Sequence, residues 1–177
     1  FECCENLEEI VTGKINPLEL FYGNADSKIA KNIYDGTDMS SAMNELLGKI
    51  TVEIAKRSKT RILELGAGIG SGARRIFENI KNSDCEYVYS DISDFFLDNA
   101  KKEFGEDKKE FRILDINENL QSQGCKYGEF DIAVISNTMH DAENVHKTLE
   151  YISEVLKENG VLIILETTVN IRAQMVS

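Results

Sequence analysis

The segment that begins at Glu64 has the residue types and the spacing of a turn that holds a charged ligand. Three glycines alternate after this carboxylate, at Gly66, Gly68 and Gly70. Glycine lets the backbone turn sharply and lets a ligand approach the main chain closely. The dinucleotide fingerprint G-x-G-x-x-G needs its third glycine one residue later, where this chain has Ser71. Because a carboxylate before the turn would repel a pyrophosphate, the segment favours a ligand with a cationic centre and an amino group.

A carboxylate followed by G-x-G-x-G is also the first motif of the class I S-adenosylmethionine-dependent methyltransferases, and the chain resembles them at this point. S-adenosylmethionine has a cationic sulfonium and an amino group, and it carries no phosphate. The alternative is a glycine-rich turn that binds nothing. The resemblance implies that this cofactor, and its demethylated product S-adenosylhomocysteine, contact a first group of residues, namely Glu64, Gly66, Ala67, Gly68 and Gly70.

Polar residues follow the other predicted strands, at the edge where parallel sheets bind ligands. The two carboxylate oxygens of Asp91 can bind both hydroxyls of a ribose. Asp115 can accept a hydrogen bond from the adenine amino group, and Asn137 follows the fourth strand. Each has a structural alternative, since Asp and Asn often cap helices and form turns. We expect a second group of cofactor-binding residues to comprise Asp91, Ile92, Asp115, Ile116 and Asn137.

His140 and Glu166 form a candidate catalytic pair. They follow the fourth and fifth predicted strands, which are neighbours in the class I methyltransferase sheet and would lie about 4.8 Å apart. Methyl transfer from a sulfonium is an in-line displacement, so the enzyme has to position the acceptor and remove its proton. Histidine is a suitable base near neutral pH, and a carboxylate can orient it and stabilise its cation. His146 lies on a predicted helix and is interpreted as solvated surface.

Strands that alternate with helices must position these residues. The strands are predicted at 61–65, 87–91, 111–114, 130–136 and 161–166, and the helices at 70–80, 93–104 and 142–157. Asn159-Gly160 is predicted to end the last helix. Repeated β-α units predict an α/β fold with a doubly wound, mostly parallel sheet and right-handed crossovers, which is the Rossmann-like arrangement.

The number of predicted strands is lower than in the class that the chain resembles. Class I methyltransferases have seven strands in the order 3-2-1-4-5-7-6, whereas five are recognised here. The fifth strand is apolar from Val161 to Leu165 and would form a bare sheet edge. We expect either that the native protein continues past the end of this chain or that a partner covers the edge, and we favour continuation.

The residues before the sheet carry helical patterns. Helices are predicted at 18–22, 26–34 and 39–56 from capping residues, breakers and apolar spacing. We therefore predict an N-terminal helical lid over residues 1–58. A Rossmann-like methyltransferase core, lacking the strands after the fifth, is predicted over residues 59–177.

The amino-acid composition limits which partners the protein could bind and in which compartment it would lie. With 42% hydrophobic and 29% charged residues the chain is an ordinary globular one, and no apolar run approaches the roughly 20 residues of a membrane span. The net charge of −11 argues against a nucleic acid partner, because phosphate contacts need a basic face. Four cysteines without C-x-x-C or Cys/His spacing predict no metal site and a reduced, cytoplasmic compartment.

The run from Gly13 to Thr167 resembles the methyltransferase domains of modular polyketide synthases and of related hybrid polyketide/non-ribosomal peptide megasynthases. The segments that carry the resemblance are 13–21, 62–68, 87–93 with Phe95-Phe96, 114–116, Gln123-Gly124, 130–137 with His140, and 165–167. The resemblance implies a helical lid and a catalytic pair at His140 and Glu166. It also implies an acyl carrier protein that presents the substrate, neighbouring megasynthase domains, and no membrane.

The chain departs from that family at two places. After Asn137 the family's usual Val-Leu-His-Ala-Thr is replaced by Thr138-Met-His-Asp-Ala142, and Ser71-Gly72 replaces a more typical Gly-Thr pair. Because carbon-methylating members keep these segments most strictly, we slightly favour O-methylation of a hydroxyl on the carrier-bound intermediate over C-methylation of its α-carbon. A non-catalytic binding domain of the same fold and an NAD-dependent oxidoreductase are further alternatives. The complete set of candidate site residues argues against the first, and Glu64 with Ser71 argues against the second.

Overall fold

Five parallel strands form the central sheet of the part of the chain that the structure describes. This computed structural model describes residues 5–16, 36–55, 59–80, 84–107 and 109–167. The strands are β1 (Thr60–Leu65), β2 (Cys85–Asp91), β3 (Lys109–Ile113), β4 (Phe130–Ser136) and β5 (Leu156–Leu165), in the spatial order β3-β2-β1-β4-β5. All four strand pairs are parallel. The strand order reverses between β1 and β4, so the predicted doubly wound α/β sheet is confirmed and its switch point lies there.

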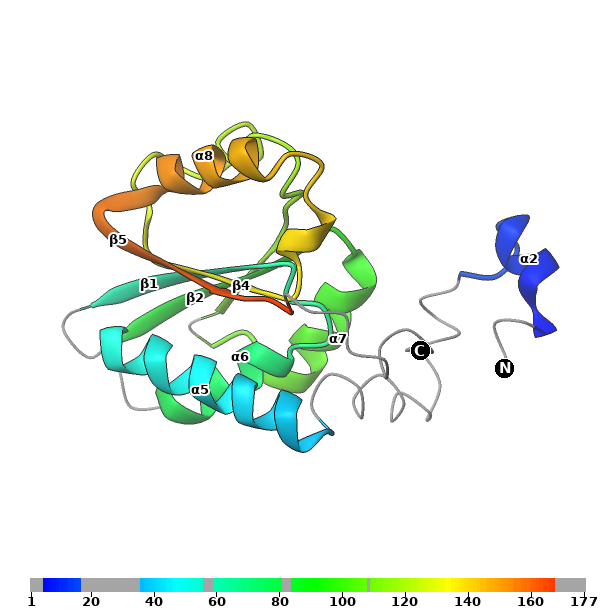
Figure 1. Cartoon of the computed structure of the whole chain (residues 1–177), viewed down its shortest axis with the longest axis horizontal. Helices are drawn as coiled ribbons and strands as arrows, with labels where there is room; N and C mark the ends of the chain where they lie inside the picture. The colour runs from blue at the N-terminus through cyan, green and yellow to red at the C-terminus, as the bar shows by residue number, and fades with distance from the viewer. Residues whose placement is uncertain (1–4, 17–35, 56–58, 81–83, 108, 168–177) are drawn as a thin grey trace.

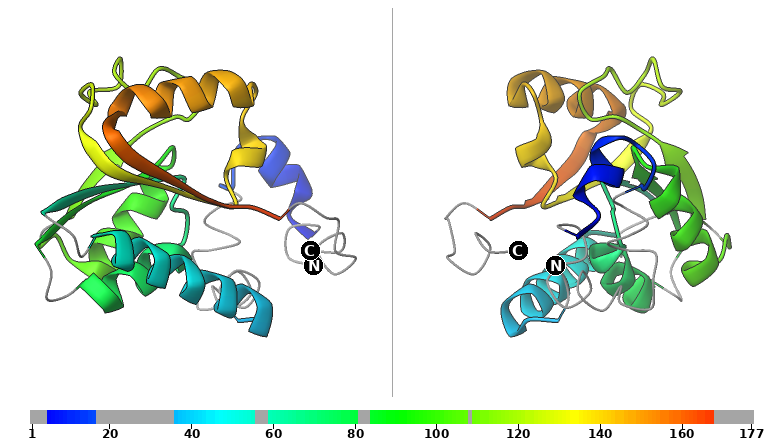
Figure 2. Two further views of the ribbon diagram at one scale, coloured as in Figure 1. Left: turned by 60° about the vertical axis from the view of Figure 1, so that its left-hand side comes forward. Right: turned by 90° about the vertical axis from the view of Figure 1, so that its right-hand side faces the viewer.

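Helices cover both faces of this sheet (Figure 1). The face above it in that view carries α8 (Val145–Val155), and the opposite face carries α5 (Asp38–Ala55), α6 (Ser71–Ile80) and α7 (Asp94–Phe104). The two side views of Figure 2 show the same layers. The short helix α2 (Leu7–Val11) and the 3-10 turn η1 (Met139–Asp141) are the other helical elements that the structure describes.

Alternate side chains of the strands divide the core into two layers. Ile62 of β1 and Tyr87 of β2 pack with apolar residues of α5, α6 and α7. Leu63 and Val88, the next residues along, pack with residues of α8. Successive side chains of a strand point to opposite faces, and a parallel sheet covered on both sides is apolar on both. Glu64 departs from this rule, because it is a buried carboxyl group within β1.

The last helix is shorter than predicted, and the fifth strand begins earlier. The prediction of a helix over 142–157 is corrected to α8, and β5 starts at the residue that follows this helix. Phe130 pairs with Leu156, and the next aligned pair is Ile132 with Val161, so residues 157–160 form a bulge in β5. Asn159-Gly160 therefore lies inside the bulge and does not end the helix. The strands β2 and β3 also begin before the predicted positions.

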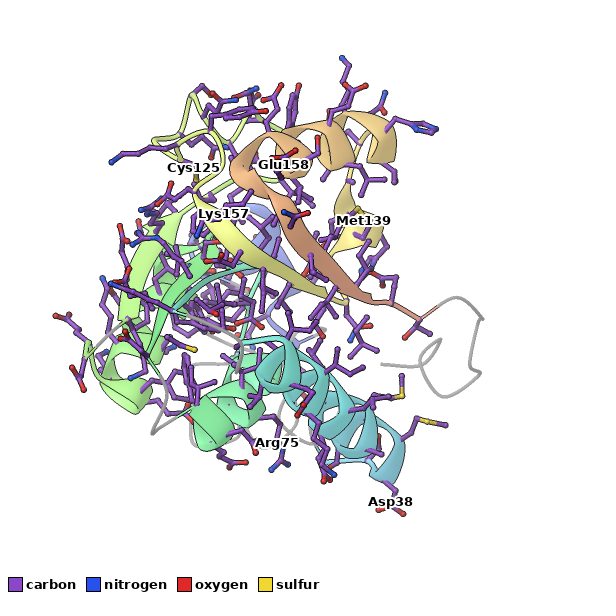
Figure 3. All side chains as sticks on the ribbon, turned by 90° about the vertical axis from the view of Figure 1, so that its left-hand side faces the viewer. Asp38, Arg75, Cys125, Met139, Lys157 and Glu158 are labelled. Atoms are coloured by element: carbon purple, nitrogen blue, oxygen red, sulfur yellow. The ribbon has the colours of Figure 1, made fainter. Side chains whose placement is uncertain are left out.

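A long-range ion pair holds the bulge in place. The ammonium group of Lys157 lies 2.8 Å from both carboxylate oxygens of Asp131 on β4. Figure 3 shows Lys157 and Glu158 where β5 begins, and Met139 toward the other end of β4 and β5. Because the contact joins residues far apart in sequence, no local pattern could have indicated it.

The helix α5 packs closely against α6. A Cβ atom on Gly48 would lie 3.0 Å from the backbone and Cβ of Arg75, so only glycine permits this approach of the two helices. The predicted helix at 39–56 corresponds to α5, whereas those at 18–22 and 26–34 lie outside the described residues. The boundary of the lid at residue 58 also lies outside them and stays a prediction. None of the helices that the structure describes has the length and apolarity needed to cross a bilayer.

Candidate active site

The glycine turn follows β1 and has a left-handed backbone at each alternate residue. The φ angles are 64° at Gly66, 55° at Gly68 and 76° at Gly70. A Cβ atom on Gly66 would lie 2.2 Å from the Cγ2 atom of Thr138, whose hydroxyl donates to the Gly66 carbonyl oxygen at 3.0 Å. A Cβ atom on Gly68 would meet nothing within 4 Å. The turn is therefore packed tightly on the Gly66 side and open on the Gly68 side, where a ligand can reach its main chain.

Residues of β2 hold this turn from the side. Asp91 accepts the N–H of Gly68 at 2.9 Å with one carboxylate oxygen and the N–H of Ser93 at 2.9 Å with the other. The hydroxyl of Tyr89 donates to the Gly68 carbonyl oxygen at 2.7 Å. Asp91 is only 6% exposed, and burial raises its pKa although the accepted N–H groups lower it. Each oxygen keeps lone-pair capacity for a further donor such as a ribose hydroxyl.

Glu64 lies beneath the turn as a buried carboxyl group. It is 1% exposed, and its Oε2 atom accepts a hydrogen bond from the Tyr87 hydroxyl at 2.8 Å. Burial raises the pKa of Glu64 to about 8, the Tyr87 hydroxyl opposes the rise, and the charge of Asp91 adds to it. At neutral pH this group holds its proton, and it can ionise when a cation approaches.

These groups surround a cavity of about 340 Å³ at the carboxyl ends of the strands. The cavity is lined by every residue of the two predicted cofactor groups except Gly70, namely Glu64, Gly66, Ala67, Gly68, Asp91, Ile92, Asp115, Ile116 and Asn137. Gly70 instead closes the turn, its N–H donating to the Ala67 carbonyl oxygen at 2.9 Å. The described residues contain no group of three His, Cys, Asp or Glu side chains suited to a metal ion.

The far side of the cavity is formed by the loop after β3. Asp115 accepts the N–H of Asn117 at 2.8 Å, and its own N–H donates to the side chain of Gln123 at 2.7 Å. Ile116 is buried and Ile92 is exposed, and both contribute apolar side chains to the lining of the cavity. Asp115 thus has the local hydrogen bond of a turn residue and also faces the cavity.

His140 and Glu166 are brought together from the ends of β4 and β5. The Nδ1 atom of His140 lies 2.7 Å from Oε1 of Glu166, and Oε2 of Glu166 accepts the N–H of Met139 at 3.0 Å. The imidazole is 59% exposed, and its Nε2 atom lies 3.7 Å from a carboxylate oxygen of Asp141. Neither partner lines the cavity itself, but Thr138 and Asp141, on either side of His140 in sequence, do. The pair therefore lies beside the cavity.

The backbone before this pair is strained. Asn137 has a φ of 51°, the one positive value at a non-glycine residue in the described ranges. Its N–H donates to the carbonyl oxygen of Leu165 at 2.8 Å, which fastens the end of β4 to the end of β5. Asparagine tolerates the left-handed region better than most residues, and such strain concentrates at functional sites.

Sequence reasoning missed several residues that line the cavity. They include Asn44 of α5, Phe96 of α7, and Asn117, Thr138 and Asp141 of the loops. Asn44 had a detectable signal, because it is one of two polar residues, with Thr51, on the buried face of α5. Ser71, noted above as a departure from the dinucleotide fingerprint and from the family, also lines the cavity, and its buried hydroxyl has no hydrogen-bond partner in the part of the chain that the structure describes. The unpaired Ser71 hydroxyl and the nearby Glu64 carboxyl group together suit the charged amino-acid end of S-adenosylmethionine.

A carboxyl group and a glycine turn at the switch point of a parallel sheet are the features expected of a class I S-adenosylmethionine-dependent methyltransferase. A family model described as a methyltransferase domain matches residues 63–162, and the chain belongs to this family. The predicted fold, cofactor and enzyme class are confirmed.

Among curated relatives, the chain is similar to parts of two megasynthases. It is 32% identical over 167 residues to the hybrid PKS-NRPs synthetase opdA of Penicillium oxalicum, covering 93% of this chain and 4% of that protein. It is 28% identical over 176 residues to polyketide synthase PksM of Bacillus subtilis, covering 93% and 4%. The chain therefore spans a small part of the curated relatives that it matches.

Three solved structures share the fold. The CurJ carbon methyltransferase matches with a TM-score of 0.83 and 25% identity, over 95% of this chain and 46% of that one. The DszA carbon methyltransferase matches with a TM-score of 0.79 and 27% identity, over 94% and 46%. The trans-methyltransferase CalH, in complex with S-adenosylhomocysteine, matches with a TM-score of 0.67 and 27% identity, over 92% and 45%.

Proposed function

We propose that the chain methylates the α-carbon of a β-ketoacyl intermediate held on an acyl carrier protein. The observation that carries this proposal is the 2.7 Å contact between His140 and Glu166 beside the cavity, which provides an oriented base. The two structural neighbours CurJ and DszA are carbon methyltransferases. This similarity favours the α-carbon as the methyl acceptor. The departures from the family's sequence pattern had slightly favoured a hydroxyl instead.

The residues of the pair divide the proton transfer between them. Glu166 accepts the Nδ1–H of His140, so the lone pair of Nε2 is left to take a proton from the substrate. His140 removes the α-proton of the β-ketoacyl thioester, and the C–H electrons form an enolate. The imidazolium that results lies beside Glu166 and near Asp141, whose carboxylates stabilise its charge.

When bound, S-adenosylmethionine would supply an activated methyl group to the enolate carbon and would be converted to S-adenosylhomocysteine, so no oxidant or metal would be required. The protein has to align the acceptor carbon with the methyl group, which removes much of the entropic cost of bringing the two reactants together.

We further propose roles for the two cofactor groups. Glu64 and the glycine turn take the methionine part, and Asp91 takes the ribose hydroxyls with the lone pairs that Gly68 and Ser93 leave free. Asp115 accepts the adenine amino group, between the apolar side chains of Ile92 and Ile116. Asn137 holds the loop that carries His140, next to the end of β5, which Glu166 directly follows.

The partners of the whole protein belong to the same proposal. The similarity of the chain to short parts of megasynthases supports neighbouring domains, and tethering by a carrier protein would deliver the acyl chain to the cavity mouth.

Mass spectrometry of carrier-bound substrates tests the reaction. The full-length protein would be incubated with labelled S-adenosylmethionine and a carrier loaded with either a β-ketoacyl or a β-hydroxyacyl chain. We expect a gain of one methyl group on the β-ketoacyl chain, with fragmentation placing it on the α-carbon. A methyl group found on oxygen would overturn the assignment of the acceptor, and no transfer to either substrate would overturn the catalytic function.

A further inference from the structure

One end of the cavity combines polar groups from α5, β1 and the start of α6. Asn44 of α5 is 3% exposed, Glu64 is the buried carboxyl group of β1, and Ser71 is the first residue of α6. All three line the cavity. The hydroxyl oxygen of Ser71 is buried and has no hydrogen-bond partner within the described ranges, so it bears a cost that a bound ligand could remove.

The packing of α5 on α6 fixes where Asn44 stands. A Cβ atom on Gly72 would lie 3.2 Å from the side chain of Leu47, and one on Gly48 would lie 3.0 Å from Arg75. Asn44 lies three and four residues before Leu47 and Gly48, so it occupies the same face of α5, one turn closer to its start. The amide is therefore held against the cavity by two close helix contacts.

Position 72 cannot supply a hydroxyl on this turn of α6. A Cβ atom on Gly72 would lie 2.8 Å from Oε1 of Glu64, so any side chain there would collide with the buried carboxyl group. Serine at the preceding position avoids this collision, and rotation about its Cα–Cβ bond changes the direction of the hydroxyl.

The chemistry of this end matches an amino acid in its zwitterionic form. An α-ammonium group fits Glu64, which can ionise when a cation approaches. An α-carboxylate fits a hydroxyl donor, an amide donor and the first N–H groups of a ten-residue helix, which have no partners within the helix. The cavity lining also includes the apolar side chains of Ile92 and Ile116, which suit an adenine.

We propose that Ser71 and Asn44 bind the α-carboxylate of the cofactor's methionine part, and so determine affinity for the amino-acid end rather than for the nucleoside. The inference rests on the cofactor placement proposed above. It also gives α5, which belongs to the predicted lid, a direct role in holding the cofactor.

Ligand binding to Ser71→Ala tests the proposal. Dissociation constants would be measured by calorimetry on the full-length protein for S-adenosylhomocysteine and for methylthioadenosine, which has the nucleoside and sulfur but no amino-acid end. We expect Ser71→Ala to weaken S-adenosylhomocysteine binding about tenfold or more, as the loss of a hydrogen bond to a charged group implies, and to leave methylthioadenosine binding unchanged. The melting temperature without ligand should not fall, because the hydroxyl has no partner to lose.

Two further variants complete the experiment. Asn44→Asp should weaken S-adenosylhomocysteine binding more than Ser71→Ala does, since it sets a negative charge against the carboxylate. Ser153→Ala, on the exposed side of α8, is the matched control and should change neither ligand.

Several outcomes would overturn the inference. Equal loss of both ligands in Ser71→Ala, or no loss of either, would remove Ser71 from the amino-acid end. A fall in the melting temperature together with unchanged affinity would assign it a structural role. If the unaltered protein bound no S-adenosylhomocysteine at all, the proposed cofactor placement would fail instead.

Discussion

The two ends of the sheet differ in how far their polar side chains are paired within the protein. At the amino end of the strands, charged side chains pair with one another. Arg61 lies 2.7 Å from both Glu86 and Glu110, and the guanidinium of Arg112, which belongs to the second half of β3, lies 3.0 Å from Glu129 just before β4. At the carboxyl end, Glu64 is bonded to a tyrosine hydroxyl and the Ser71 hydroxyl has no partner in the described part of the chain. The charged groups at the amino end are therefore paired with one another, whereas polar groups at the carboxyl end remain able to bind a ligand.

Two carboxyl groups show the difference in their acidity. Burial raises the pKa of Glu64, and no cation opposes it among the causes of the shift. Burial would also raise the pKa of Glu129, but the backbone N–H of Lys126 and the guanidinium of Arg112 hold it below its ordinary value. The pH dependence of stability should therefore have opposite signs at the two ends.

Removing the proposed base should give the largest effect. We expect His140→Ala to lower the rate of methyl transfer by about 10² to 10⁴-fold, because general base catalysis contributes that much, while the affinity for S-adenosylhomocysteine is kept. The measurement is transfer of labelled methyl groups to a loaded carrier. His146→Ala, which alters an exposed histidine of α8, is the control. Turnover that survives the loss of His140 would remove it from the mechanism.

Replacing Glu64 by glutamine should remove the contribution of the carboxyl end of the sheet to the pH dependence of stability. The folded state keeps the Glu64 proton up to about pH 8, whereas the unfolded chain loses it near the ordinary value of 4.5. Between these values the folded state binds more protons, so the contribution of Glu64 to stability is complete below 4.5 and is lost as the pH rises toward 8.

The expected size of this effect is several kcal/mol, at about 1.4 kcal/mol for each unit of pKa shift. Denaturant unfolding of the natural protein and of Glu64→Gln, each followed from pH 5 to about pH 9, measures it as a difference between the two curves. Parallel curves for the two proteins would show that the Glu64 proton is not retained on folding.

Adding one methyl group to the glycine turn at Gly66 should destabilise the protein, because this side of the turn is tightly packed. In Gly66→Ala the new Cβ atom would lie 2.2 Å from Thr138, at a φ of 64° that alanine tolerates poorly. We expect a loss of about 2–4 kcal/mol in the free energy of unfolding.

The matched control is Gly124→Ala, which has a φ of 97° and no atom within 4 Å of the added group. It should cost only about 1 kcal/mol, the share of backbone strain alone. Equal losses in the two variants would mean that Thr138 yields to the new atom without cost. Thermal or denaturant unfolding decides between these results.

Cutting the ion pairs at the amino end should give the smallest effect. Arg112→Met leaves Glu129 without one of its partners, and we expect a loss of about 1–2 kcal/mol in unfolding free energy. Affinity for S-adenosylhomocysteine should not change, because the site lies at the other end of the strands. Lys101→Met, which removes an exposed pair with Asp98, should cost less than about 0.5 kcal/mol. A fall in ligand affinity in Arg112→Met would contradict the separation of the two ends.

The sequence predicted those features that local patterns determine. Alternating apolar runs indicated the strands, and carboxylates directly after them indicated the cofactor groups, because the carboxyl ends of parallel strands converge. The predicted start of β5 was wrong, since the observed start depends on pairing with Phe130 and on the Lys157–Asp131 contact. Asn44 was missed because its place at the cavity is set by the packing of α5 on α6, which involves residues remote in sequence.

The bulge at residues 157–160 has a consequence for how the chain can change length. Ile132 and the residues after it keep an unbroken alignment with β5, and the N–H of Asn137 is fastened to the Leu165 carbonyl oxygen. An insertion or deletion within the bulge would alter its size at the start of β5, while the aligned pairs keep Glu166 beside His140. Homologous chains can therefore vary in length here without disturbing the geometry of the base.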